Sequence, residues 1–288
     1  LRASTLYLPN NIVPMLPAGA LGNALCSLNA GVWRPCIYME ARVPYDSGKG
    51  VTASLRQGKV KVSDNYAYEC ASLIASPSYE LLKEATSLCW KRERYVEAID
   101  DSHDIVAFWM TFMNTVAAES LGQGGIYRAT KGQTSKCTCS VRDTLPMSTR
   151  RLSNTIGQVQ AQYVLGNRNR IHSLIGSGQR PYTHITSPIR RLVDLINRIV
   201  LDGVLGWSSL SADATEFASA WLEKVEFLNT WSIQARRLQS DAKLLHQASL
   251  GLIGDVLYGY PLQRLANSYG YLVHFPNLDM LIPIKCEE

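Results

Sequence analysis

The hydrophobic pattern of this chain changes from a period of two residues to a period of 3.6 residues near Ser76. Apolar and polar side chains alternate over 36–43 and 51–55, and the glycine-containing segment 46–50 lies between them. Two alternating runs around such a turn are typical of an antiparallel hairpin. A chain of 288 residues that is 46% apolar can bury at least one core. The pattern therefore predicts a β-rich start and a helical middle.

Helical spacing dominates the chain after Ser76-Pro77, where a capping hydroxyl precedes a proline suited to a first helical turn. The most regular apolar stripe follows Ser187-Pro188 and is expected to end at Gly203. Extended runs are expected to return after Gly254. Apolar stripes predict the other helices over 81–89, 105–116, 213–228 and 230–250.

The net charge of +5 is compatible with an anionic partner but does not identify one. The basic cluster Lys91 to Arg94 is interpreted as a solvated helix end. Seven cysteines, an odd number, favour a reducing intracellular compartment such as the cytoplasm or an organelle matrix. Cys137 and Cys139 have no second pair at zinc spacing, so free thiols are expected.

No apolar stretch is long enough for a membrane helix, and no targeting leader is visible. Because residue 1 is Leu rather than Met, the sequence is expected to begin inside a longer protein. The lack of a leader therefore says little about location.

The segment from Tyr182 to Arg191 concentrates hydrogen-bond donors and cations. With Ser187 as the expected N-cap, Arg190 and Arg191 would lie in the first turn, where free N–H groups already favour an anion such as phosphate. In the alternative, Arg190 and Arg198 bracket Asp194 in an ion-pair ladder on one helix face. His184 could act as an acid or base, although a loop histidine more often makes a structural hydrogen bond. The residues alone leave these alternatives open.

The same segment resembles the signature of the ribonuclease II/R (RNB) family, which reads Tyr-Thr-His-Phe-Thr-Ser-Pro-Ile-Arg-Arg and differs here only at Ile185. A second resemblance runs from Tyr7-Leu8-Pro9-Asn10 through 12–17 to 25–29. Weaker ones occur at 65–69, 104–114 and 126–128. Together they cover about residues 1–250 in consistent order.

The resemblance implies an α/β (α+β) fold with a bent antiparallel sheet packed with helices and an RNA channel between them. It implies Mg²⁺-dependent, 3′-to-5′ hydrolysis of single-stranded RNA to nucleoside monophosphates. Arg190 would contact the scissile phosphate and is the expected catalytic residue. Asp194 and Arg198 would give structural support. The residues expected to bind RNA are Tyr7, which would stack on a base, with Tyr182, Thr183, His184, Ser187 and Arg191.

Two departures from the family put activity in question. The aspartates that hold Mg²⁺ in the family lie before the Tyr-Leu-Pro match, so no metal ligands are expected within this chain. Gln239 stands where the family has a glutamate, and an amide cannot serve as a base. The acidic run 100–104 is interpreted as a helix cap rather than a metal site. The alternative function is an inactive RNB-like domain that binds RNA or serves as a scaffold.

The expected domains are an RNB-like domain over 1–250 and a β-rich tail over 251–288. The tail would be the start of a small OB-type RNA-binding domain or a terminal strand pair. Expected partners are single-stranded RNA and a helicase or larger RNA-processing complex, without a membrane.

Overall fold

The computed structural model divides into two compact units. Unit 1 contains Leu1–Thr5, Pro14–Ala129 and Gln162–Asn229, and unit 2 contains Leu6–Val13, Thr130–Ala161 and Thr230–Glu288. Helices and small antiparallel sheets are mixed, which confirms the α/β (α+β) class. The predicted domain boundary at residue 250 stays a prediction. The structure describes residues 2–17, 19, 25–46, 48–96, 98–130, 145–146, 149, 152, 161–166, 171–172, 180–254, 256–265 and 270–285.

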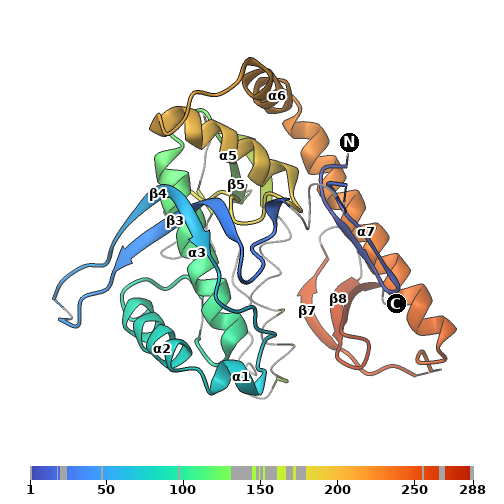
Figure 1. Cartoon of the computed structure of the whole chain (residues 1–288). Helices are drawn as coiled ribbons and strands as arrows, with labels where there is room; N and C mark the ends of the chain where they lie inside the picture. Colours follow the sequence, from blue (N-terminus) through green and yellow to red (C-terminus); the bar gives the residue numbers. More distant parts are fainter. Residues whose placement is uncertain are drawn as a thin grey trace. The chain divides into compact units, whose positions relative to one another are not determined.

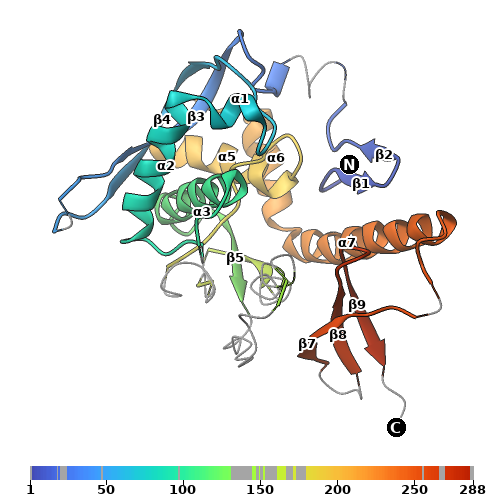
Figure 2. The same ribbon diagram turned by 90° about the horizontal axis from the view of Figure 1, so that it is seen from below.

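The predicted hairpin is present in unit 1. Strands β3 (Trp33–Arg42) and β4 (Thr52–Lys61) pair antiparallel, so that Trp33 lies opposite Lys61. Met39 and Leu55 pack against a buried cluster that contains residues of the long helix α3. The two strands form one long hairpin in unit 1 (Figures 1 and 2). Its turn end is bonded to the helical part, because Arg92 donates to the Pro44 and Asp46 carbonyls at 2.8 Å.

Helix α3 (Ser102–Ser120) forms the centre of the unit 1 core, with Ile105, Phe108 and Phe112 buried. It begins where the acidic run predicted, because the Asp101 carboxylate accepts a hydrogen bond from the Asp104 amide at 3.1 Å. The described residues contain no group of three or more potential metal ligands. The Asp101 hydrogen bond confirms that this run caps the helix.

Two shorter helices precede α3. Helix α1 spans Ala71–Ile74, and α2 spans Pro77–Trp90. Ser76 is the N-cap residue of α2, as predicted, but its hydroxyl makes no capping hydrogen bond.

Helix α5 (Leu192–Leu205) begins and ends later than predicted. Arg191 is its N-cap residue with an extended backbone, because Ser4 pairs with it in an antiparallel bridge. Ser187 is therefore not the N-cap, and residues 188–190 form a turn. Gly203 lies inside the helix, which ends at Gly206 in the left-handed conformation that glycine adopts easily.

Strands β5 (Ile126–Thr130) and β6 (Ala161–Leu165) pair beside α5. Their buried residues Tyr127 and Val164 join Ile185 and Leu201 in one cluster. Helices α6 (Ala212–Leu222) and α7 (Val225–Ser249) follow. The break between them lies at 223–224, earlier than the predicted one at 229.

Unit 2 contains most of α7, a short hairpin and a three-stranded sheet. The hairpin pairs β1 (Leu6–Leu8) with β2 (Asn11–Val13). The antiparallel sheet has the order β7 (Tyr260–Arg264), β8 (Gly270–Phe275), β9 (Met280–Lys285), which confirms the predicted β-rich tail.

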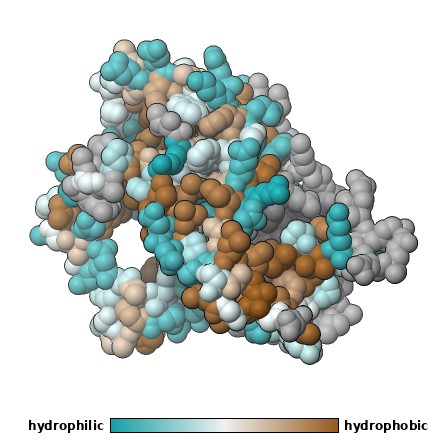
Figure 3. All heavy atoms as spheres, turned by 90° about the vertical axis from the view of Figure 1, so that its right-hand side faces the viewer, coloured by the Kyte–Doolittle hydropathy of each residue, from teal (hydrophilic) through white to brown (hydrophobic). Residues whose placement is uncertain are grey.

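Apolar packing joins the sheet of unit 2 to its helix. Leu244 of α7 packs against the buried cluster formed by Phe275, Leu278 and Met280. Figure 2 shows the strands of this sheet beside α7. Apolar side chains also gather on part of the face in Figure 3. Exposed apolar residues of α7 and the following segment include Leu238, Leu245, Leu250 and Leu252. Every described helix is too short or too polar to cross a bilayer.

Removal of the α3 cap should destabilise unit 1 without a change of fold. We expect Asp101→Ala to lower the free energy of unfolding by about 1 kcal/mol, because the Asp104 amide loses its acceptor. Asp101→Asn should restore most of the loss, since asparagine caps equally well. Urea unfolding followed by circular dichroism measures both. Equal destabilisation by the two variants would contradict the cap.

Candidate functional site

The turn 187–191 presents one arginine to solvent and holds it from both sides. The amides of Arg190 and Arg191 donate to the Ser187 carbonyl at 3.1 and 3.0 Å. The Arg190 carbonyl accepts from the Thr5 amide at 3.0 Å, and the Leu192 amide donates to the Ala3 carbonyl at 2.9 Å. The Arg190 side chain is exposed and forms no hydrogen bond or ion pair with the described residues. Its backbone is fixed while its charge is available to a ligand.

The second arginine of the turn forms an ion pair with a buried carboxylate. Arg191 donates to Asp194 at 2.9 Å through Nη2, and its Nε lies 2.9 Å from the other carboxylate oxygen. The Ser187 amide also donates to Asp194, at 2.7 Å. Burial raises the pKa of Asp194, and Arg191 partly offsets this increase. Asp194 therefore fastens the end of the loop to the start of α5.

The predicted ion-pair ladder is wrong. Arg190 and Arg198 do not bracket Asp194, because Arg190 lies in the turn rather than one helical turn before it. Arg198 instead forms an ion pair with Asp202. The two residues expected to give structural support do so through different partners.

Two buried asparagines hold the loop Tyr182–Ile185. Asn197 of α5 accepts from the Ile126 amide at 2.8 Å and donates to the Thr183 hydroxyl at 2.7 Å and the His184 carbonyl at 3.1 Å. Asn114 of α3 accepts from the Ile185 amide and donates to the Tyr182 hydroxyl, both at 3.0 Å. Sequence reasoning missed both. A polar residue on an otherwise apolar helix face was the available signal.

The side chains of Tyr182 and Thr183 are buried. The Thr183 hydroxyl donates to the Ile126 carbonyl at 2.6 Å, and the Tyr182 ring lies edge-on to His172 and His184. These contacts shape the loop from inside. Direct contact of either residue with RNA stays a prediction.

His184 of the loop is hydrogen-bonded to a tyrosine of strand β6. Its Nδ1 lies 3.0 Å from the Tyr163 hydroxyl. Burial, reinforced by the positive charges of Arg191 and Arg128, lowers the pKa of His184 well below its usual value. A neutral ring with this partner fits the structural hydrogen bond better than the acid–base role.

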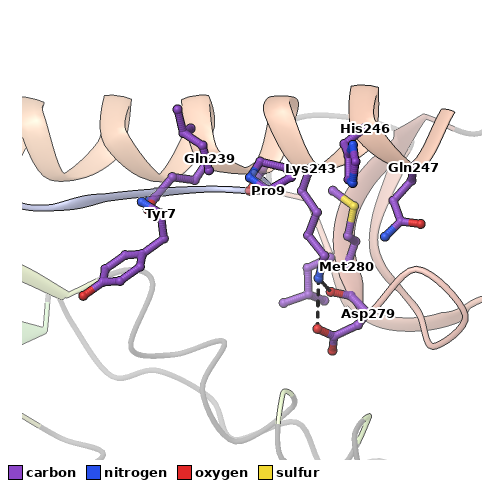
Figure 4. Close-up of a pocket in the computed structure, with 11 residues that line it drawn as sticks. Tyr7, Pro9, Gln239, Lys243, His246, Gln247, Asp279 and Met280 are labelled. Atoms are coloured by element: carbon purple, nitrogen blue, oxygen red, sulfur yellow. Dashed lines mark hydrogen bonds and ion pairs between the residues drawn. The ribbon is translucent and has the colours of Figure 1, made fainter. Parts of the chain in front are cut away.

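Tyr7 and Gln239 belong to unit 2 and lie together. The Tyr7 amide donates to the Gln239 side-chain oxygen at 2.6 Å, and the Gln239 amide nitrogen donates to the Ala235 carbonyl at 3.1 Å. The Tyr7 side chain is exposed. Its ring points away from the helix that carries Gln239 (Figure 4). An exposed ring on a strand anchored in this way is suited to stacking on a base.

A pocket of about 510 Å³ lies around these two residues. At its other end Lys243 donates to the Asp279 carboxylate at 2.9 Å and to its carbonyl at 2.7 Å (Figure 4). Gln239 carries an amide, which cannot act as a base, and Asp241 lies 3.9 Å from Arg237 on the exposed face. The described carboxylates here are paired with cations and do not form a metal site. The remaining lining residues are Leu8, Pro9, Ser240, His246, Gln247, Met280 and Leu281.

Part of the chain is similar in sequence to known proteins. The family model described as "RNB domain" matches residues 1–85. Ribonuclease R of Vibrio cholerae is 24% identical over 260 residues, which cover 68% of this chain. Over these residues the chain is similar to RNB-family proteins. It spans 32% of the length of that relative.

Solved structures share the fold of this chain. Mycoplasma genitalium RNase R in complex with ribose-methylated single-stranded RNA matches with a TM-score of 0.64 and 19% identity, over 98% of this chain and 55% of that one. Yeast Ssd1, a pseudonuclease, matches with a TM-score of 0.66 and 15% identity, over 99% and 43%. The fold is therefore ribonuclease-like and is shared by a nuclease and by a pseudonuclease.

Loss of the Asn197 amide should be costly, because it leaves buried main-chain groups and the Thr183 hydroxyl without partners. We expect Asn197→Ala to lower the free energy of unfolding by about 3 kcal/mol. Asn65→Ala is the matched control, since the exposed Asn65 also makes two main-chain hydrogen bonds but water can replace them. It should cost less than about 1 kcal/mol. Equal losses in urea unfolding would contradict the assigned role.

Buried His172 should make unit 1 sensitive to acid. Burial, and then Arg128, lower its pKa from 6.5 to about 4. The unfolded chain takes up this proton at a higher pH than the folded chain. His172 should therefore lower the free energy of unfolding by at most about 3 kcal/mol as the pH decreases from about 6.5 to about 4. His184, whose pKa is also lowered, should add to the slope in the same direction. Urea unfolding over this pH range measures the slope.

His172→Phe should flatten that slope, whereas the exposed His103→Phe should leave it unchanged. An identical pH profile for His172→Phe and the original protein would exclude His172 as its source.

Proposed function

We propose that this chain holds the 3′ end of single-stranded RNA within a 3′-to-5′ exoribonuclease that releases nucleoside monophosphates. The observation that carries the proposal is the exposed Arg190 guanidinium, which has no protein partner among the described residues although its turn is fixed on both sides. The neighbouring Arg191 is paired with Asp194. A free cation on a rigid support is what a phosphate contact requires.

Arg190 would contribute by contacting the scissile phosphate. A guanidinium donates two parallel hydrogen bonds to phosphate oxygens and stabilises the additional charge that develops when the phosphodiester is attacked. The buried Asn114 and Asn197 would keep its loop from moving as the charge changes. Electrostatic stabilisation of this kind is most effective when the donors need no reorganisation.

The exposed Tyr7 would hold the base of a nucleotide near the 3′ end. Stacking on an aromatic ring is tolerant of sequence, which suits an enzyme that degrades any single strand. Two observations support this assignment. The Tyr7-Leu8-Pro9 segment resembles the family, and M. genitalium RNase R, which shares the fold, forms a complex with single-stranded RNA.

Magnesium dependence is also part of the proposal. Magnesium prefers several oxygen ligands in near-octahedral geometry. The buried Asp194 and the exposed Asp279 each pair with a cation, and the described residues provide no cluster of ligands. The residues that hold the ion are therefore proposed to lie outside the described part of the chain.

A second candidate is a domain that binds RNA without cleaving it. Two observations favour it. The side chain of Gln239, where the family has a glutamate, is used to bond the main chain at Tyr7 and Ala235. The fold also matches that of the pseudonuclease Ssd1. Both candidates require RNA at Arg190, and only the cleavage step separates them.

Arg190→Ala should separate binding from cleavage. In the protein that contains this chain, with Mg²⁺ and a 5′-labelled single-stranded RNA, we expect single-turnover cleavage to slow by about 10²- to 10³-fold. RNA affinity should fall by less than about tenfold, because other contacts remain. Arg94→Ala is the control, since it removes an exposed arginine that stacks on Trp90, away from the Arg190 turn.

The other outcomes decide between the candidates. An unchanged cleavage rate in Arg190→Ala would remove Arg190 from the transition state. If the original protein binds the RNA with Mg²⁺ but never shortens it, the second candidate, RNA binding without cleavage, replaces the exonuclease. Absence of RNA binding by the original protein would exclude both.

A further inference from the structure

Most of the net charge of this chain is concentrated in one hairpin. The segment 33–61 carries six lysines and arginines against two acidic residues, which accounts for four of the five net positive charges. The acidic residues are Glu40 and Asp46. The basic residues are Arg34, Arg42, Lys49, Arg56, Lys59 and Lys61.

Four of these cations form two groups, with Arg42 and Arg56 on one face of the hairpin and Lys59 and Lys61 on the other. On one face, Glu40 neutralises part of the charge, because Arg56 donates to it at 2.8 Å and Arg42 lies 3.9 Å away. On the other face, Lys59 and Lys61 are exposed and make no hydrogen bond or ion pair with a described residue. The second group is therefore available to an anion.

The free lysines lie beside an exposed tryptophan. The strand register places Trp33 opposite Lys61 and Pro35 opposite Lys59, and side chains at alternate positions share a face. The Trp33 side chain is 62% exposed. Farther along the same face, Met39 and Leu55 are covered by the core of unit 1. We name the uncovered part, Trp33, Pro35, Lys59 and Lys61, the Trp33 face.

The backbone under the Trp33 face is clamped. The Gly31 amide donates to the Val62 carbonyl at 2.8 Å. Asn65 accepts from the Ala30 amide at 2.7 Å and donates to the Leu28 carbonyl at 3.1 Å. These bonds close the open end of the hairpin and order the backbone that carries the indole and the lysines.

A purely protective role explains only part of this arrangement. Lysines on exposed strands prevent edge-to-edge aggregation, and Pro35 would serve the same purpose. That role does not require a large exposed indole, which by itself favours association. An aromatic ring interleaved with free cations is instead the composition of a surface that binds single-stranded nucleic acid by stacking and phosphate contacts.

We propose that the Trp33 face is a second contact for single-stranded RNA, with a base stacked on Trp33 and backbone phosphates on Lys59 and Lys61. The inference rests on the proposed function only in taking RNA as the ligand, since the face shares no residue with the Arg190 turn. The hairpin would then bind RNA without sequence specificity, because neither contact depends on base identity.

The test is the salt dependence of RNA affinity in a pair of charge-matched variants. Lys59→Gln/Lys61→Gln should lower the slope of log Kd against log salt concentration by about 1.4, since each phosphate contact on a single strand contributes about 0.7. Lys83→Gln/Lys91→Gln, which removes two exposed lysines of α2 and its end, should leave the slope unchanged. The ligand is a long oligouridylate, and the full chain is used.

Trp33 provides an independent measurement. RNA should quench part of the tryptophan fluorescence of the original protein. Trp33→Phe should abolish this quenching, and the RNA affinity of the variant should stay within about threefold of the original. Trp33→Ala should weaken affinity by about tenfold. Thermal unfolding of each variant checks that the fold is kept.

The outcomes separate this inference from the proposed function. If the original protein binds RNA but the two double variants share one slope and Trp33→Ala binds normally, the Trp33 face is not an RNA contact. The Arg190 experiment is unaffected by that result. If the Lys59/Lys61 variant instead loses binding to anionic phospholipid vesicles and keeps RNA affinity, the surface is a membrane contact and the inference is overturned.

Discussion

The loop from Tyr182 to Arg191 has little regular secondary structure, and its shape depends on buried side chains that satisfy its main-chain groups. Asn197 and Asn114 reach it from two helices, and the Asp194 carboxylate binds the Ser187 amide. A buried main-chain group without a partner costs about 1–3 kcal/mol, so each of these side chains strongly selects one loop conformation. The rest of the candidate site follows from that conformation.

Because the loop is fixed, its two arginines have different environments. Arg191 lies over Asp194 and is partly buried, whereas Arg190 is exposed at the tip of the turn. Because the Asp194 carboxylate pairs with Arg191, Arg190 has no carboxylate partner among the described residues. The same principle distinguishes the two faces of the β3–β4 hairpin, where Glu40 binds Arg56 and leaves Lys59 and Lys61 without partners among the described residues. In both places a local pairing decides which cation a ligand can reach.

Sequence patterns predicted the elements well and their ends less well. The β3–β4 hairpin, α3 with its acidic cap and the strands after α7 were all expected from period and capping residues. The start of α5 was predicted at Ser187-Pro188 and lies at Leu192. That error arose because Ala3 and Thr5 bond the main chain of Leu192 and Arg190, and a distant segment leaves no signal in a local pattern. Asn114 and Asn197 could be noticed as polar residues on apolar helix faces, but their bonding partners lie in remote segments that a local pattern does not reveal.

The sequence by itself determined the class of the fold, the resemblance to RNB proteins and the set of candidate residues for a phosphate contact. Those properties depend on side-chain chemistry and on periodicity along the chain, which are local. Only the tertiary structure decided that Asp194 binds Arg191, that Arg198 binds Asp202 and that Arg190 is left exposed. Ion pairing depends on distances of a few ångströms between groups, and those distances are set by packing and by pairing with remote segments.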